Sequence, residues 1–233
     1  MRGFLQFLIT LAVPIVLTMT AVRLLTLPWY PTWQYSREGF PEDPLGLSRE
    51  ERLRLARGTI GFLNVPWRVD TLERLALPDG SPAYGPRELE HMDDVKAVYN
   101  ALTLLALLLA VAAVIAVWGL IRRQARCAIW GALAQGGALT LAVLLGLGLW
   151  MLVGFNAFFT FFHGLFFESG TWVFSYSDTL IRLFPLPFWQ DAGLLIAAGV
   201  SAVSLLLLVV GTWQHRLCWA SAYSSSTPKG ASA

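Results

Sequence analysis

The amino-acid sequence predicts an all-α integral membrane protein, with four transmembrane helices and a small mixed extracytoplasmic cap. Hydrophobic residues make up 56% of the chain and charged residues only 14%, whereas soluble domains carry about 25% charged residues. Four stretches without charge are each long enough to cross a bilayer, which takes about 20 apolar residues. Most of the charged residues of the chain lie between the first two of these stretches.

Each span is placed inside one of the charge-free stretches. The first could be a secretory signal peptide, but no convincing A-x-A cleavage site follows it, so we expect a retained helix. The third stretch stays uncharged from Cys127 to Phe167, which is too long for one crossing. We therefore expect it to divide into a span and a following aromatic segment. The predicted spans are residues 1–27, 97–121, 128–154 and 192–214.

Positively charged residues near the spans set the predicted orientation, because short loops rich in Lys and Arg stay in the cytoplasm. With four spans, one side holds the N-terminus, the loop 122–127 and the tail 215–233. These places carry Arg2, Arg122, Arg123, Arg126, Arg216 and Lys229. We therefore expect a protein of the bacterial cytoplasmic membrane whose regions 28–96 and 155–191 face the outside. The tail from Ser221 is small and polar and is expected to be disordered.

The outer region 28–96 is predicted to form the cap. Ser48 and Glu51 match a capping box, which predicts a helix over residues 49–57 that stops at Gly58. Leu77-Pro-Asp-Gly80 is typical of a turn and could join two short strands. Both cysteines, Cys127 and Cys218, fall near the predicted cytoplasmic side, so no disulfide is expected in the cap.

Two of the three histidines are predicted to meet at the outer membrane surface. Gly85-Pro86 starts a helix that runs into the second span and places His91 just outside it. His163 lies in a phenylalanine-rich run at membrane depth, where an ionisable residue is costly and is a functional candidate. Because imidazole exchanges protons near neutral pH, this pair could perform acid–base chemistry. His215 falls on the opposite side.

Acyl transfer could use the pair directly. One imidazole would take a proton from an attacking amine, and the other would protonate the departing alkoxide or hold the oxyanion. Lys96 or Asn156 could help to hold the oxyanion, although snorkelling of Lys96 and helix capping by Asn156 are favoured. Glu88, Asp94 and Asp178 are further supporting candidates.

Other side chains near the histidines have structural as well as functional interpretations. Asp178 lies four residues before Arg182, and a modest surface salt bridge between them is favoured. Several aromatic residues could line an acyl-chain groove or simply contact lipid. These residues are Phe158, Phe162, Phe166 and Trp172.

Two other classes of function remain open from the residues. A metal-dependent membrane hydrolase could bind zinc through both histidines and carboxylates such as Asp94, Asp178 or Glu168, but no H-E-x-x-H motif supports it. A non-enzymatic membrane component, such as a haem-binding subunit, usually places its histidines within facing spans, whereas these lie at span ends. We find no phosphate-binding loop and no nucleic-acid-binding module.

Two blocks of sequence resemble the lipoprotein intramolecular transacylase family of bacterial membrane proteins. The first is Glu88-Leu89-x-His91-Met92-x-Asp94-Val95-Lys96, and the second is Phe162-His163-x-x-Phe166-Phe167, followed by Trp172, Phe174, Asp178, Leu180-Ile181 and Leu183-Phe184-Pro185. The similarity covers about residues 1–215 and is loose in residues 28–70.

The resemblance implies a specific reaction and a specific pair of residues. Such an enzyme moves the sn-2 acyl chain of a diacylglyceryl-cysteine lipoprotein from glycerol oxygen to the cysteine amine, giving a lyso-form lipoprotein. Its substrate is anchored in the outer leaflet, and the family uses two catalytic histidines, which His91 and His163 match. No cofactor or metal is implied. Because His163 lies deeper, we expect it near the ester and His91 near the amine, with the acid and base roles open.

Overall fold

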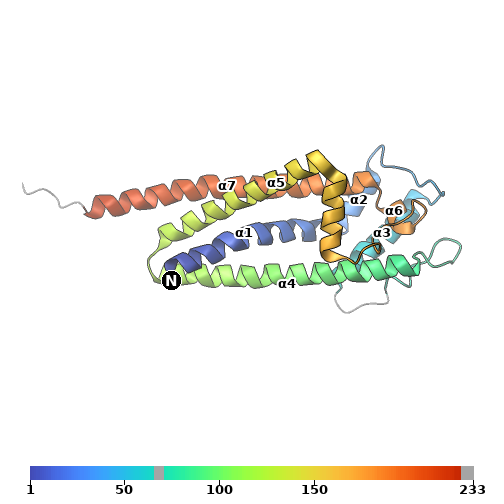
Figure 1. Cartoon of the computed structure of the whole chain (residues 1–233), viewed down its shortest axis with the longest axis horizontal. Coiled ribbons are helices and arrows are strands. Elements are labelled where there is room, and N and C mark those ends of the chain that lie inside the picture. The colour runs from blue at the N-terminus through green and yellow to red at the C-terminus, as the bar shows by residue number, and fades with distance from the viewer. Residues whose placement is uncertain (66–70, 227–233) are drawn as a thin grey trace, which may run out of the picture. The chain divides into compact units, whose positions relative to one another are not determined.

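The computed structural model describes residues 1–65 and 71–226, and this part of the chain is mainly helical (Figure 1). Its helices are α1 (Arg2–Leu25), α2 (Trp29–Ser36), α3 (Arg49–Asn64), α4 (Pro86–Arg122), α5 (Arg126–Phe166), α6 (Thr179–Leu183) and α7 (Leu186–Ser226). Within the described ranges there is no β-strand. The two short strands considered around Leu77–Gly80 are reduced to one isolated antiparallel bridge between Ala76 and Pro82. The all-α class is confirmed.

Four of these helices, α1, α4, α5 and α7, are long and apolar enough to cross a membrane, which confirms a four-span, multi-pass membrane protein. α4 has 37 residues and is about 55 Å long at 1.5 Å per residue, whereas a bilayer core needs only about 20 residues. Its uncharged part, residues 97–121, exposes many Leu, Val and Ile side chains, as a lipid-facing helix does. Residues 86–96 are the polar start of the same helix and extend beyond this span.

α5 and α7 are both longer than the spans predicted within them. α5 has 41 residues and is interrupted at Gly154, whose backbone is not helical (φ −158°, ψ 70°). Gly154 is also the residue at which the predicted span 128–154 ends, and residues 155–166 form a second helical piece. α7 continues to Ser226, so the tail is helical to that point. The rest of the predicted tail, residues 227–233, lies outside the described residues.

The chain divides into two compact units. The first contains Met1–Met19, Leu105–Leu149 and the residues from Ala197 onward, and the second contains Thr20–Leu104 and Trp150–Ile196. α1, α4, α5 and α7 each contribute residues to both units. The second unit holds His91 and His163, whereas His215 belongs to the first.

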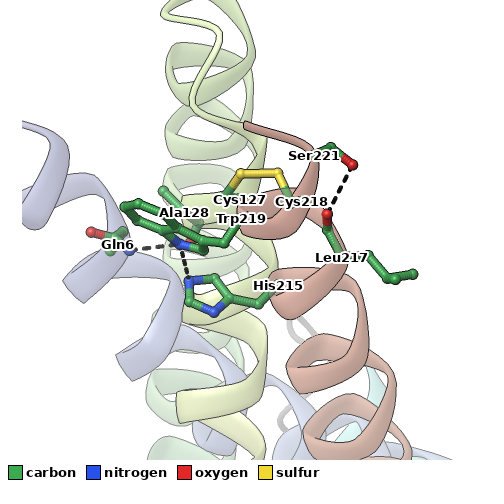
Figure 2. The surroundings of a disulfide bond; sticks show 8 residues. All are labelled: Gln6, Cys127, Ala128, His215, Leu217, Cys218, Trp219 and Ser221. Atoms are coloured by element: carbon green, nitrogen blue, oxygen red, sulfur yellow. Dashed lines mark hydrogen bonds between the residues drawn. A yellow bond between two sulfur atoms is a disulfide. The ribbon is translucent and has the colours of Figure 1, made fainter. Parts of the chain in front are cut away.

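In the first unit, small residues let α5 and α7 approach closely. A Cβ atom on Gly137 would lie 2.5 Å from the backbone oxygen of Ser204, and one on Gly211 would lie 2.8 Å from that of Trp130. Close backbone contact through glycine is a common way for membrane helices to associate. A disulfide between Cys127 and Cys218 joins the same two helices (Figure 2). Both cysteines were expected near one side of the membrane, but a bond between them was not predicted.

In the second unit, α3 begins as predicted but ends later. Ser48 accepts a hydrogen bond from the backbone N–H of Glu51 at 3.1 Å, as the capping box requires. The predicted stop at Gly58 is wrong, because α3 continues to Asn64. A Cβ atom on Gly58 would lie 2.9 Å from Leu75 Cδ1. Glycine at this position therefore lets Leu75 pack against the helix and does not end it.

A buried ion pair anchors α6 in the same unit. The Arg182 guanidinium donates from Nε and Nη2 to the Asp43 carboxylate at 2.9 and 2.8 Å, and the two side chains are 8% and 0% exposed. The predicted surface pair of Asp178 with Arg182 is therefore wrong. Asp178 instead accepts the backbone N–H of Ser175 at 2.7 Å. A buried guanidinium needs a buried counter-charge, and Asp43 provides it from a distant part of the sequence.

Candidate functional site

The first turns of α4 hold His91 in fixed surroundings. Pro86 is the first helical residue, a position that suits proline. The Glu88 carboxylate accepts the backbone N–H of Gly85 at 2.8 Å, which is the return bond of a helix cap. Its other oxygen accepts the N–H of Leu180 in α6 at 2.8 Å. Glu88 is buried, and this burial raises the pKa of its carboxyl group. Its contacts make Glu88 a link between α4 and α6.

The His91 imidazole lies between two aromatic rings. The centroids of Phe167 and Phe174 are 5.1 and 5.2 Å from that of the imidazole. The Nδ1 atom is buried and has no hydrogen-bond partner among the described residues. Burial lowers the pKa of His91 below its usual 6.5, the neighbouring His163 lowers it further, and Asp94 opposes both effects. His91 is therefore a neutral imidazole near pH 7, with an unused polar atom.

His163 belongs to the helical piece that follows the break at Gly154. In this piece, aromatic side chains four residues apart contact one another and form two rows. One row joins Phe155, Phe159, His163 and Phe167, with centroid distances of 6.0, 3.9 and 5.8 Å. The other joins Phe158, Phe162 and Phe166, with distances of 6.2 and 5.3 Å. Spacing by four places residues on one face of a helix, which explains why the phenylalanine-rich sequence surrounds the imidazole with rings.

A backbone hydrogen bond fixes the tautomer of His163. Its Nδ1 lies 2.8 Å from the carbonyl oxygen of Phe159. A carbonyl oxygen can only accept a hydrogen bond, so Nδ1 carries the proton. In the neutral ring, Nε2 then has a free lone pair and can act as a base.

The two histidines meet through Phe167, whose ring contacts both imidazoles. Trp172 packs against His163 and Phe159, with ring centroids 4.8 and 5.6 Å away. The indole Nε1 of Trp172 is buried and, like His91 Nδ1, has no hydrogen-bond partner in the described part of the chain. The histidine pair and its neighbour Trp172 thus hold two buried polar atoms without a partner among the described residues.

The other predicted supporting residues lie in different surroundings. Asp94 acts on His91 through its charge. Lys96 does not snorkel, since its side chain is buried and its Nζ lies 3.8 Å from the centre of the Phe62 ring. Asn156 is exposed, two residues after the Gly154 break. Asp178 accepts the backbone N–H of Ser175, as described above.

A small cavity of about 160 Å³ adjoins the site. It is lined by Gly85, Pro86, Arg87, Glu88, Phe174 and Asp178. Phe174, which lines the cavity, also contacts the His91 imidazole. Across the residues that the structure describes, no three His, Cys, Asp or Glu side chains come together to hold a metal ion.

Some contacts of the site were not predicted from the sequence. Phe159 and Phe167 belong to the phenylalanine-rich run, but their contact with the His163 ring was not predicted, although their spacing of four residues before and after it could have indicated this contact. Trp172 was predicted only as a wall of the acyl groove. Its unpartnered N–H is a property of the packed structure, for which the sequence carries no signal.

Comparisons with known proteins show what this chain is similar to in sequence and in fold. A family model described as lipoprotein intramolecular transacylase Lit matches residues 5–189. An uncharacterized protein of Aquifex aeolicus (strain VF5) is 29% identical over 211 residues, covering 91% of this chain and 94% of that protein. The structure of the lipoprotein intramolecular transacylase Lit from Bacillus cereus has a TM-score of 0.72 and 21% identity, over 93% of this chain and 98% of that one. A variant of that protein in which one histidine is replaced by arginine gives a TM-score of 0.69 and 18% identity, over 95% of both chains.

Proposed function

Because the chain belongs to the lipoprotein intramolecular transacylase family, we propose that it moves the sn-2 acyl chain of a diacylglyceryl-cysteine lipoprotein to the cysteine α-amine. The product is a lyso-form lipoprotein. The observation that carries this proposal is the meeting of His91 and His163 on the Phe167 ring. Each histidine has a ring nitrogen without a hydrogen-bond partner among the described residues. We place the site at the extracytoplasmic face of the bacterial cytoplasmic membrane, from the Arg-rich short loops.

The energetics suit a site built from side chains alone. Conversion of an ester into an amide is downhill, so the reaction needs no external acyl donor. The amine and the ester belong to one molecule, so the enzyme gains the advantage of proximity once it orients them.

In the proposed mechanism, His163 is the general base. The amine is protonated in solution and first loses one proton to the medium. Nε2 of His163 then takes a second proton as the nitrogen attacks the ester carbonyl. A C–N bond forms, and the C=O π electrons move to oxygen. When the C–O bond to glycerol breaks, the departing oxygen receives the proton from the His163 imidazolium.

His91 acts on the oxyanion in this scheme. A neutral imidazole donates one N–H, and the lowered pKa of His91 keeps the ring neutral. Its unpartnered Nδ1 is available for the carbonyl oxygen of the substrate. This assignment reverses our expectation from depth, which placed His91 at the amine. The hydrogen bond to Phe159 supports it, because it leaves Nε2 of His163 with the lone pair that a base needs.

The acyl chain is proposed to lie along the row of Phe158, Phe162 and Phe166. Phe158 stacks on Phe162, and Phe162 meets Phe166 edge to face. Phe162 also contacts His163 edge-on at 5.5 Å. Phe162 is 43% exposed, so the row presents apolar surface next to the proposed base. Such a surface can receive a lipid chain without loss of hydrogen bonds.

A crossover experiment tests this function. Two synthetic diacylglyceryl-cysteine lipopeptides would be mixed with the purified protein in nanodiscs, one with a deuterated sn-2 chain and one with a heavy-isotope peptide. Tandem mass spectrometry should find N-acyl cysteine at unchanged total mass, with each label still on its own molecule. Exchange of labels would contradict intramolecular transfer. Released fatty acid would favour a hydrolase, and unchanged lipopeptides would refute the proposed function.

A further inference from the structure

We infer that the indole N–H of Trp172 donates a hydrogen bond to the substrate's ester carbonyl oxygen and forms, with His91, the oxyanion site. This inference rests on the proposed acyl transfer. It assigns to Trp172 a polar role that differs from lining a groove for the acyl chain.

The first support is the unpartnered state of this N–H. Buried indole N–H groups usually find an acceptor, and in this chain even two exposed tryptophans do so. Trp189 donates to the carbonyl oxygen of Phe184 at 2.9 Å, and Trp219 donates to Nε2 of His215 at 3.0 Å. Nε1 of Trp172 is buried without a partner in residues 1–65 and 71–226. A buried donor without an acceptor destabilises the fold. An acceptor oxygen on the substrate would supply the hydrogen bond that the Trp172 N–H lacks.

The second support is the position of the ring. Trp172 contacts His163 with centroids 4.8 Å apart. The attacked carbonyl carbon must bond to the nitrogen that loses its proton to His163 Nε2, so the carbonyl oxygen develops its charge within reach of His163's neighbours. Like His91, Trp172 has a buried polar atom without a hydrogen-bond partner among the described residues.

The third support is the way in which the backbone holds Trp172. Nη2 of Arg87 donates to the carbonyl oxygens of Gly170 and Val173, at 3.4 and 2.8 Å. These two bonds bracket Trp172 in the chain. Arg87 and His91 lie one turn apart on α4. The helix that carries His91 is therefore also hydrogen-bonded to the segment that carries Trp172. The turn itself is closed by Thr171, which donates from its backbone N–H and its hydroxyl to the Glu168 carbonyl oxygen.

This arrangement serves a defined step. As the amine nitrogen forms its bond to the carbonyl carbon, the π electron pair moves to oxygen. Two N–H donors, one from His91 and one from Trp172, would bind that charge. It returns to the C=O bond when the glycerol C–O bond breaks. Donors that are already in place cost no reorganisation during the reaction.

The experiment compares Trp172→Phe with Trp189→Phe in nanodiscs, with a synthetic diacylglyceryl-cysteine lipopeptide as substrate. Trp172→Phe keeps an aromatic ring and removes the unpartnered donor. We expect its kcat to fall about a hundredfold to a thousandfold, its KM to stay within about twofold, and its Tm to be no lower than that of the parent protein. Trp189→Phe removes a donor that has a partner, so we expect a lower Tm and an unchanged kcat.

The outcomes separate this inference from the proposed function. Full kcat in Trp172→Phe, with an active parent protein, would overturn the role of Trp172 alone. A rise in KM without a fall in kcat would also overturn it and would assign Trp172 to the acyl groove. A fall in kcat matched by an equal loss in Trp189→Phe would mean a structural effect and would overturn the assignment. An inactive parent protein would overturn the proposed function and this inference with it.

Discussion

Nδ1 of His163 lies 2.8 Å from the carbonyl oxygen of Phe159, one helical turn earlier in α5. This bond gives the imidazole one orientation and one tautomer, in the way that an orienting acceptor does in many sites that use histidine as a base. The backbone of the phenylalanine-rich segment thus orients the His163 imidazole, and its side chains surround the same imidazole.

Replacement of His163 by asparagine separates these effects. The asparagine amide can donate to the Phe159 carbonyl but has no atom in place of Nε2. We expect a Tm close to that of the parent protein and a kcat lower by about 10² to 10⁴, the usual worth of a general base. Both are measured on the purified protein, with His215→Asn as the matched control. An active His163→Asn enzyme would contradict the role of Nε2.

Acid should destabilise the fold partly through His91. Its pKa is lowered in the folded protein but returns to about 6.5 on unfolding. Below that pH the unfolded chain binds a proton that the folded chain resists, so stability is lost as the pH falls through 6.5. Tm measured between about pH 7.5 and about pH 5 should therefore fall less in His91→Gln than in the parent protein. Equal falls would contradict the burial of a neutral His91.

Loss of the Asp43 carboxylate should weaken the unit that contains both histidines. Asp43→Asn leaves the buried Arg182 without a counter-charge, and breaking a buried pair in this way costs about 3–5 kcal/mol. We expect a clear fall in Tm, measured by thermal unfolding in detergent. Glu51→Gln, which removes an exposed pair with Arg54, should change stability by less than about 1 kcal/mol. Similar Tm values for the two variants would contradict the buried pair.

The disulfide between Cys127 and Cys218 should stabilise the protein without affecting transfer. It closes a separation of 91 residues, and cross-links of this kind contribute about 2–4 kcal/mol. The double variant Cys127→Ser, Cys218→Ser should therefore have a lower Tm and an unchanged kcat. Alkylation without reductant, followed by intact mass measurement, checks that the bond is present in the parent protein. Two free thiols in the purified parent would contradict the bond.

Features set by local sequence were predictable. Charge-free length identified four spans, and Ser48 identified the start of α3 because a helix cap depends on neighbouring residues. The break at Gly154 also coincides with the predicted end of the third span. The positions of His91 and His163 followed from these elements, although their catalytic roles stay a prediction.

Features set by distant contacts were not predictable. Arg182 pairs with Asp43, 139 residues away, and not with the nearby Asp178. Gly58 lies inside α3 because Leu75 packs against it. The N–H of Trp172 lacks a partner because of how the surrounding side chains pack. Lys96 is buried over the Phe62 ring and does not extend toward solvent. Sequence spacing carries no information on such partners.

The central claim is that His91 and His163 together perform the transfer. The most direct measurement expresses the parent protein and the alanine variants of all three histidines in a bacterium that makes diacylglyceryl lipoproteins and lacks other N-acylation. Tandem mass spectrometry of the N-terminal lipopeptide then locates the acyl chain. We predict N-acyl cysteine with the parent protein and with His215→Ala, and a free amine with His91→Ala and with His163→Ala. N-acyl cysteine at the parent level with either of the last two variants would contradict the pair.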